Sequence, residues 1–198
     1  FLKNFNKKFK TPILYITHSI EEISQVGDQI VLIKDGKKID NGNVSNILNR
    51  SSFVDLTGKF ESSSILEGIV SRHDQNLHMT TLDLNGQKLI VPGLPGKLND
   101  IVRVRIRSRD ILLSSSRIKT QITENELQGL ISSIEIEKNS AFSELVIVLK
   151  NFKNNRKKQK IRARITTYNL KNKKLLIDDS VFIYVSSVSI DRQAYQSK

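Results

Sequence analysis

The sequence predicts a short α/β segment followed by all-β modules, and three observations support this division. An apolar run from Ile13 to Thr17 leads directly into the signals of a capped helix. From Ser64 onward, short β-branched runs alternate with Gly, Asn and Asp turns, as in small barrels or sandwiches. Residues 101–110, IVRVRIRSRD, alternate apolar and basic side chains with the period of a strand.

The α/β segment begins with a run that is almost entirely apolar and β-branched. Such a run, here Ile13 to Thr17, predicts a strand buried within a parallel sheet. Ser19 and Glu22 have the spacing of a capping box, and Gly27 follows at the position of a terminating glycine. His18 therefore lies at the carboxyl end of the strand, directly before the helix. Ligands bind at that edge in open α/β sheets, so His18 is the main candidate for a functional residue.

A hairpin and a second helix are expected to complete this segment. Residues 30–33 predict another buried strand, and Asp35-Gly36 is a strong signal for a tight hairpin. Residues 37–40 return along it. The apolar residues Val44, Ile47 and Leu48 have helical spacing.

The rest of the chain divides by composition. Residues 1–50 form the α/β segment, and the Ser-rich residues 51–63 are expected to be a linker. Residues 64–118 form one β-rich module and residues 124–191 a second. In the first, Ile111 to Leu113 are expected to continue the strand that alternates with Arg103, Arg105, Arg107 and Arg109. We expect these four arginines to lie on a solvated edge or to pair with acidic residues of the ATPase domain or of a partner subunit.

Composition narrows the functional classes. The 198 residues carry a net charge of +12 and contain no Cys, which excludes disulfides and cysteine-ligated metals. The sequence shows neither a membrane-spanning apolar run nor a signal peptide, so a cytosolic location is the default. His73 and His78 lack accompanying carboxylates, and no metal site is predicted. The basic charge fits either a polyanion-binding surface or a chain that is simply rich in Lys, Asn and Ile.

Residues 12–42 resemble the C-terminal end of an ABC-transporter ATPase (P-loop) domain. The resemblance lies in two segments, ILYITHSIEE and DQIVLIKDGKKIDNG. The resemblance implies that His18 is the switch histidine, which contacts the γ-phosphate of ATP and helps to orient the attacking water. It also implies ATP and Mg²⁺ as cofactors of the complete protein, a second copy of the subunit and membrane permease subunits as partners, and a place on the inner face of the membrane. The alternative for His18 is an ordinary hydrogen-bonded histidine at a strand end.

The second half is similar to the regulatory region of ATP-binding subunits of molybdate importers. The similar segments are LPGKLNDIVRVRIRSRDILLS, NELQG, IRARIT and VFIYVSSVSI. The resemblance implies OB-like barrels of the TOBE/Mop type and an oxyanion held by Thr123, Asn125, Ser186 and Ser187. Glu124 stands where the family places Arg, and Ser186 where it places Lys. Both changes disfavour an oxyanion at this position.

Several parts of an ABC ATPase are missing from the sequence. The phosphate cradle G-x-x-x-x-G-K-[ST] is absent, as are the Mg²⁺-binding and catalytic carboxylates that would precede His18. We therefore expect a fragment of a transport ATPase that does not hydrolyse ATP alone. Two alternatives remain: an ATPase subunit for another solute, such as sulfate, iron or polyamine, or a basic OB-like module that binds nucleic acid. The second lacks the exposed aromatic side chains that stack on single strands.

Overall fold

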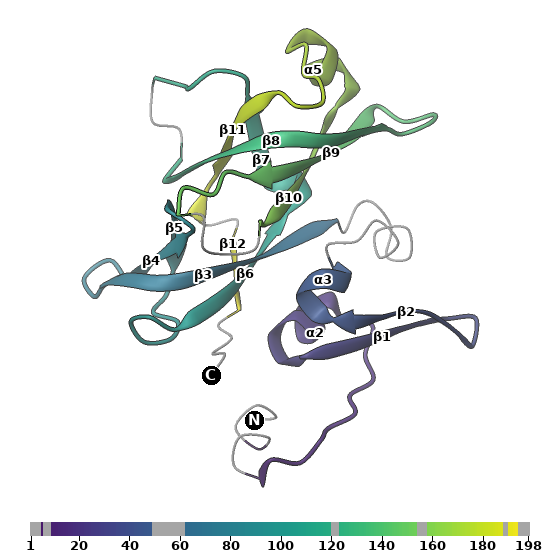
Figure 1. Ribbon diagram of the computed structural model, residues 1–198, viewed down its shortest axis with the longest axis vertical. Helices are drawn as coiled ribbons and strands as arrows, with labels where there is room; N and C mark the ends of the chain where they lie inside the picture. The colour runs from purple at the N-terminus through teal and green to yellow at the C-terminus, as the bar shows by residue number, and fades with distance from the viewer. Residues whose placement is uncertain are drawn as a thin grey trace.

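The computed structural model describes residues 5, 9–48, 62–119, 123–153, 158–187 and 190–193. In these ranges the chain forms a small N-terminal unit and two five-stranded antiparallel sheets (Figure 1). The sequence-predicted linker lies outside them, apart from Ser62 and Ser63. No helix within the described ranges has both the length and the apolar character needed to cross a membrane.

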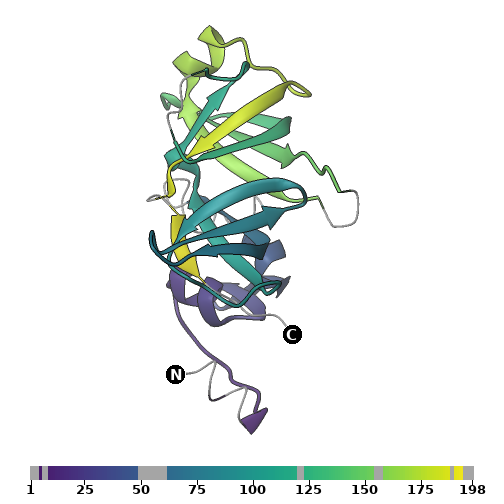
Figure 2. The same ribbon diagram turned by 90° about the vertical axis from the view of Figure 1, so that its left-hand side faces the viewer.

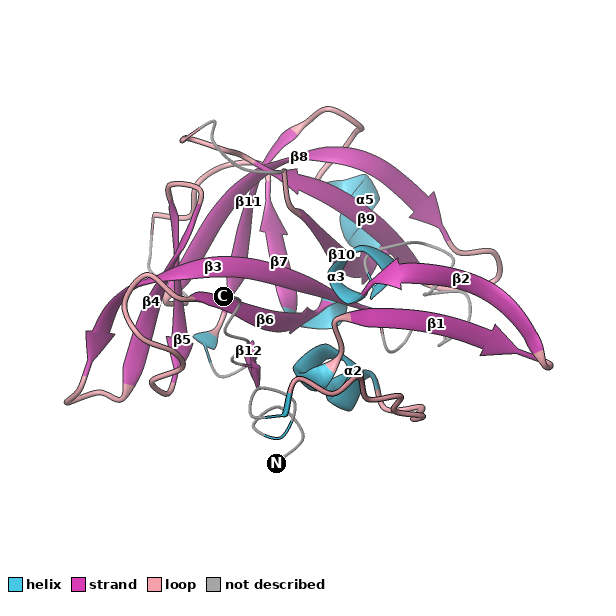
Figure 3. Cartoon of the chain, turned by 60° about the horizontal axis from the view of Figure 1, so that its bottom comes forward, coloured by secondary structure: helices cyan, strands magenta, loops and turns pink. Residues whose placement is uncertain are grey.

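The N-terminal unit consists of two short helices and a hairpin. Its elements are α2 (Ile20–Val26), β1 (Gln29–Lys34), β2 (Lys37–Asn43) and α3 (Val44–Leu48). Asp35 and Gly36 both have positive φ, at 51° and 72°, which confirms the predicted tight turn. Figure 3 shows α3 between this hairpin and the start of the long strand β3 (Ser63–Asp74). A small core results from Ile30, Val44, Ile47, Leu48 and Ile65, the last contributed by β3.

The apolar run before α2 is not a buried strand, which corrects the sequence-based expectation. Residues 13–17 adopt no regular structure, and the side chains of Leu14 and Ile16 are 91% and 89% exposed. A strand becomes buried in a parallel sheet only when neighbouring strands and covering helices surround it, and no described strand pairs with this run. The expected burial of residues 30–33 is also only partly correct, because Val31 and Ile33 are exposed.

The remaining strands form the two five-stranded sheets. The first sheet has the order β12-β6-β3-β4-β5, and the second has the order β10-β9-β8-β11-β7. The strands not yet bounded are β4 (Met79–Leu84), β5 (Gln87–Pro92), β6 (Ile101–Arg107), β7 (Ile111–Ser114), β8 (Asn125–Ile136), β9 (Phe142–Leu149), β10 (Lys160–Thr166), β11 (Ser180–Val185) and β12 (Ile190–Gln193). One short helix, α5 (Thr167–Asn172), follows β10.

The two sheets exchange edge strands. A 3-10 turn, η2 (Ser108–Asp110), separates β6 from β7, so residues 111–113 do not continue the preceding strand as expected. Instead β7 pairs with β11 at the edge of the second sheet, while β12 returns to pair with β6 at the edge of the first. In Figure 2 the yellow strands β11 and β12 accordingly lie in different sheets. One continuous hydrophobic core, from Leu66 to Val185, includes side chains from both sheets.

Three side-chain amides link the two sheets by imitating a strand backbone. Gln159 accepts from the Glu67 N–H at 2.7 Å and donates to the Glu67 carbonyl at 2.8 Å. Asn125 does the same with Ile90, at 2.6 and 3.0 Å. Gln87 accepts from the Gln128 N–H at 2.6 Å and donates to the Gln128 carbonyl at 3.0 Å. Each carboxamide has one donor group and one acceptor group, so it satisfies both backbone groups of the opposite residue.

Candidate functional site

His18 lies in a tight connection whose neighbouring side chains are fixed by hydrogen bonds. Ser19 is the N-cap of α2, and its hydroxyl accepts from the Glu22 N–H at 3.2 Å, as the capping box predicts. The other half of the box differs, because the Ser19 N–H donates to Thr17 Oγ1 at 3.0 Å and not to the Glu22 carboxylate. The side chain of His18 itself is exposed.

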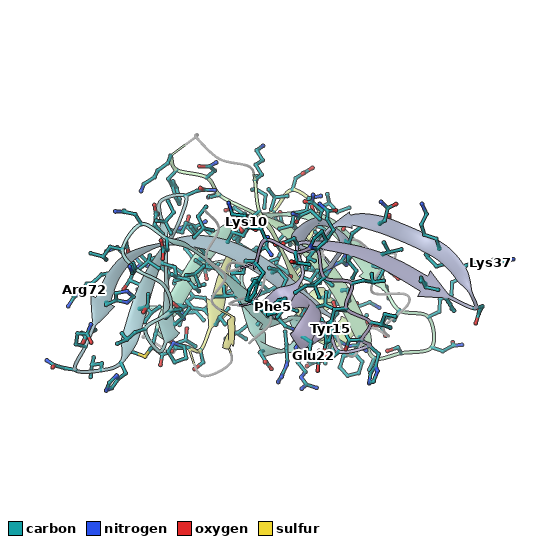
Figure 4. The ribbon with its side chains drawn as sticks, turned by 90° about the horizontal axis from the view of Figure 1, so that it is seen from below. Phe5, Lys10, Tyr15, Glu22, Lys37 and Arg72 are labelled. Atoms are coloured by element: carbon teal, nitrogen blue, oxygen red, sulfur yellow. The ribbon has the colours of Figure 1, made fainter. Side chains whose placement is uncertain are left out.

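The Glu22 carboxylate is turned toward the residues that precede His18. It accepts hydrogen bonds from the Thr17 hydroxyl and, at 3.0 Å, from the Tyr15 hydroxyl. Figure 4 shows Tyr15 beside Glu22 on the same side of the molecule. The hydrogen bond from Thr17, followed by that from Tyr15, holds the pKa of Glu22 below its ordinary value. These hydrogen bonds link the residues before His18 to the first turn of α2, and the charge of His18 also contributes to the lowered pKa of Glu22.

One arginine connects the N-terminal unit with the first sheet. Arg103 Nε lies 2.9 Å from Glu67 Oε1, and its Nη1 donates to the Gly27 carbonyl at 3.4 Å. Gly27 ends α2 with an extended backbone, φ −79°. A Cβ there would lie 2.8 Å from the Ile23 carbonyl oxygen, so the close approach of the helix end explains the glycine. The end of the helix after His18 thus contacts the β-rich region directly.

The basic face predicted for residues 103–109 is not a solvated surface. Arg103 and Arg105 are only 6% and 4% exposed, and Arg105 donates from Nε to the Ser63 hydroxyl at 3.0 Å. Five consecutive residues of β6, 102–106, are buried, so both faces of the strand are covered, and Arg103 also contacts the N-terminal unit at Gly27. Arg107 is half-buried, and Arg109 alone of the four is exposed. The second expectation places acidic partners in the ATPase domain or a partner subunit, but Arg103 pairs with Glu67 of the neighbouring strand β3, and Arg105 donates to the Ser63 hydroxyl.

The four residues predicted to hold an oxyanion lie in one region of the structure. The side-chain donors of three of them are bonded to other groups of the protein. The Thr123 hydroxyl donates to the Asn125 carbonyl at 2.9 Å. The Asn125 carboxamide is bonded to Ile90 and donates to the Ser187 hydroxyl at 3.2 Å. The Ser187 hydroxyl in turn donates to the Ile90 carbonyl at 2.8 Å. These side chains hold β5 against the start of β8, and their donors are already used.

The remaining donors converge on Glu124. The backbone N–H of Ser187 donates to Glu124 Oε2 at 2.9 Å, and the Ser186 hydroxyl lies 3.5 Å from the same oxygen. The hydrogen bond from the Ser187 N–H is the main cause that holds the pKa of Glu124 below its ordinary value. From the sequence, Glu124 is only a charge that repels an oxyanion, and the bonds that it accepts come from a residue 63 positions away. The only sequence feature that points to Glu124 is that it stands where the related family has Arg.

No cluster of metal ligands accompanies these groups. Within the ranges that the structure describes, no three His, Asp or Glu side chains gather in a way that could hold a metal ion. His73 Nδ1 is instead bonded to the Thr80 hydroxyl at 2.8 Å, across the β3–β4 pair.

Comparison with known proteins agrees with the motifs. No protein-family profile matches the chain. The molybdenum import ATP-binding protein ModC of Haemophilus influenzae is 28% identical over 190 residues, covering 96% of this chain and 52% of the relative. ModC of Mesorhizobium japonicum is 27% identical over 97% of this chain and 50% of the relative. ModC of Rhizobium johnstonii is 32% identical over a shorter stretch, 68% of this chain.

A solved structure shares the fold of the β-rich part. The cytoplasmic molybdate-binding protein ModG, crystallised with molybdate, aligns with a TM-score of 0.56 at 15% identity. The alignment covers 67% of this chain and 96% of ModG. At this identity the similarity establishes the fold, and it confirms the expected OB-like architecture of the TOBE/Mop type. The chain spans about half the length of the curated relatives it matches. Over nearly its whole length it is homologous to molybdenum import ATP-binding proteins, so the resemblance indicated by its motifs is confirmed.

Proposed function

We propose that this chain corresponds to the C-terminal part of the ATP-binding subunit of a molybdate importer. The observation that carries the proposal is a similarity to such subunits that extends over 96% of the chain. In this proposal residues 1–50 end the ATPase domain, residues 64–118 and 124–191 form the regulatory tail, and ATP hydrolysis in the complete protein drives import. The subunit would act as a homodimer on the inner face of the membrane, bound to permease subunits.

His18 is the residue that we propose to act on the nucleotide. Its imidazole is exposed, and its backbone is fixed by the Ser19 cap and by the bonds of Thr17 to Ser19 and Glu22. An N–H donor held in this way can bond to the γ-phosphate of ATP and help to position the attacking water. The exposed apolar run before it fits a strand whose neighbours belong to the rest of an ATPase domain. The phosphate cradle and the Mg²⁺ ligands would come from that domain too.

The proposal can be tested with a chimera. The part of the H. influenzae relative that is not aligned, which we expect to carry the phosphate cradle, is joined to the start of this chain, and ATP turnover is measured. We expect turnover by the chimera and none by the chain alone. Changing His18→Ala should lower turnover by about 10²-fold or more, as removal of a donor to the reacting group does in other enzymes.

A matched control variant is His78→Ala. His78 is also exposed but lies in the turn between β3 and β4, so its removal should leave turnover unchanged. Equal turnover by the parent chimera and the His18 variant would contradict the assigned role. His18-dependent turnover by the unfused chain would contradict the proposal that it is inactive alone.

Two alternatives from the sequence concern the imported solute and nucleic-acid binding. The names of the relatives favour molybdate over sulfate, iron or polyamine as the imported solute. Against nucleic-acid binding, Arg103 and Arg105 are buried and engaged with Glu67 and Ser63. A gel-shift titration near physiological salt should show no complex with single-stranded DNA or RNA, because the basic face predicted from the sequence is not available.

A further inference from the structure

The contacts of Glu124 have the form of a small anion-binding site with the anion already in place. An oxyanion in a neutral protein site is held by backbone N–H groups and hydroxyls that point at one oxygen. Glu124 Oε2 receives the backbone N–H of Ser187 at 2.9 Å and faces the Ser186 hydroxyl at 3.5 Å. We call these two donors, the Ser187 N–H and the Ser186 hydroxyl, the cradle.

The cradle is built on a rigid support. Ser187 is 3% exposed, and its hydroxyl is bonded to the Ile90 carbonyl and to the buried Asn125. Asn125 is fully buried and bonded to the backbone of Ile90 on both sides. The Ser187 N–H is therefore fixed in direction, and the exposed Glu124 side chain is the movable member.

We propose that Glu124 is a built-in anion that occupies the oxyanion cradle of the regulatory tail and keeps free oxyanions out of it. The ligand class that it replaces is a tetrahedral oxyanion such as molybdate or sulfate. This inference rests on the proposed function for the identity of the anion, but the occupied cradle is a property of this chain's own residues.

Two physical effects favour the built-in carboxylate over a free ion. A tethered group competes at an effective concentration of millimolar order or above, which exceeds that of a trace solute. A carboxylate in the cradle also repels a second anion at contact distance. The bond from the Ser187 N–H also lowers the pKa of Glu124, which means that this contact favours the charged carboxylate over the neutral acid.

The test measures oxyanion binding by calorimetry with the full chain and three variants. Glu124→Ala empties the cradle and removes the charge, whereas Glu124→Gln removes the charge but leaves a tethered acceptor. Glu126→Ala is the matched control, because Glu126 lies two residues further along and pairs with Arg117 at 3.0 Å outside the cradle. It makes the same change in net charge.

We expect Glu124→Ala to bind sodium molybdate at least about tenfold more tightly than the wild type or Glu126→Ala, with Glu124→Gln between them. In ¹⁵N-resolved NMR spectra, molybdate should shift the Ser187 amide resonance in the Glu124→Ala variant alone. Equal binding of molybdate, sulfate and phosphate alike by Glu124→Ala and Glu126→Ala would overturn the proposal, and so would tight binding of any of them by the wild type. Thermal melts of all four proteins establish that each is folded.

Parallel titrations with sulfate and phosphate separate this inference from the proposed function. A gain for sulfate and phosphate without a gain for molybdate would support the occupied cradle and contradict molybdate as its anion. A gain for no oxyanion would contradict the occupied cradle and leave the ATPase assignment to the chimera experiment.

Discussion

The N-terminal unit and the β-rich region differ in how far their apolar side chains are buried. Before α2, Leu14 and Ile16 are almost fully exposed. The core of the N-terminal unit contains five buried residues, and one of them lies in β3. In the β-rich region, Leu82, Leu127 and Ile147 are completely buried in one core that joins both sheets. This difference shows that an apolar run becomes a buried strand only where neighbouring strands and covering elements surround it. In the described part of this chain they surround the β-rich strands but not residues 13–17.

The polar groups of the two regions differ in whether their hydrogen-bond partners lie within this chain. His18 is exposed, and we propose that its ligand is held largely by groups outside this chain. Glu124, Asn125 and Ser187 are bonded to one another and to Ile90, so the donors of the tail are satisfied from within. The proposed ligand site of the first region therefore needs groups from outside this chain, whereas the polar groups named in the second region bond to one another. Three predictions test this contrast.

The largest effect is expected from breaking the buried ion pair of the second sheet. Arg162 Nη1 lies 3.5 Å from Glu144 Oε2, with side chains 9% and 3% exposed. Replacing Arg162→Met leaves the Glu144 carboxylate buried without this partner and should cost about 3–5 kcal/mol in the free energy of unfolding. Urea unfolding followed by circular dichroism measures the loss.

The same variant should show a distinctive pH dependence. Burial raises the pKa of Glu144, while the charge of Arg162 lowers it. A raised folded-state pKa means that stability falls as the pH rises from the ordinary carboxyl pKa through the raised one. Arg162→Met should therefore lose more stability at pH 8 than at pH 5, and adding Glu144→Gln should restore most of it. An equal loss at both pH values would show that Glu144 does not ionise there.

The next effect compares the two cores directly. Leu127 and Ile47 are both fully buried, and truncation of either to Ala should cost about 2–5 kcal/mol where the core cannot collapse. We expect Leu127→Ala to lower the melting temperature of the whole β-rich region. Ile47→Ala should raise amide hydrogen exchange in β1, β2 and α3 and leave that of β8 and β9 unchanged. Equal loss of protection in β8 from both variants would mean that the two regions unfold as one.

The smallest effect is expected in the exposed run. Leu14→Asn should change the free energy of unfolding of this chain by less than about 0.5 kcal/mol, because no buried contact is lost. In the chimera with the ATPase segment, the same substitution should lower the melting temperature clearly, since the run would then be a covered strand. An identical response in both proteins would contradict the strand assignment.

Local features of the fold could be predicted because their causes lie within a few residues. The Ser19 cap, the Asp35-Gly36 turn and the helical spacing of Val44 and Ile47 each depend on neighbours in sequence, and all three are present. The OB-like class of the second half also followed from its motifs. The structure places Asn125 beside Ser187 and Glu124 beside Ser186 and Ser187, while an oxyanion at these residues stays a prediction.

The sequence by itself therefore determined the caps, the turns, the strand-rich texture and the family resemblance. Only the tertiary structure decided that residues 13–17 are exposed, that Arg103 and Arg105 are buried, and that β7 and β12 are exchanged between the sheets. It also decided that Glu124 receives the Ser187 N–H. The physical reason is that burial and hydrogen bonding of these groups depend on partners distant in sequence, and no local pattern records which partners the folded chain brings near.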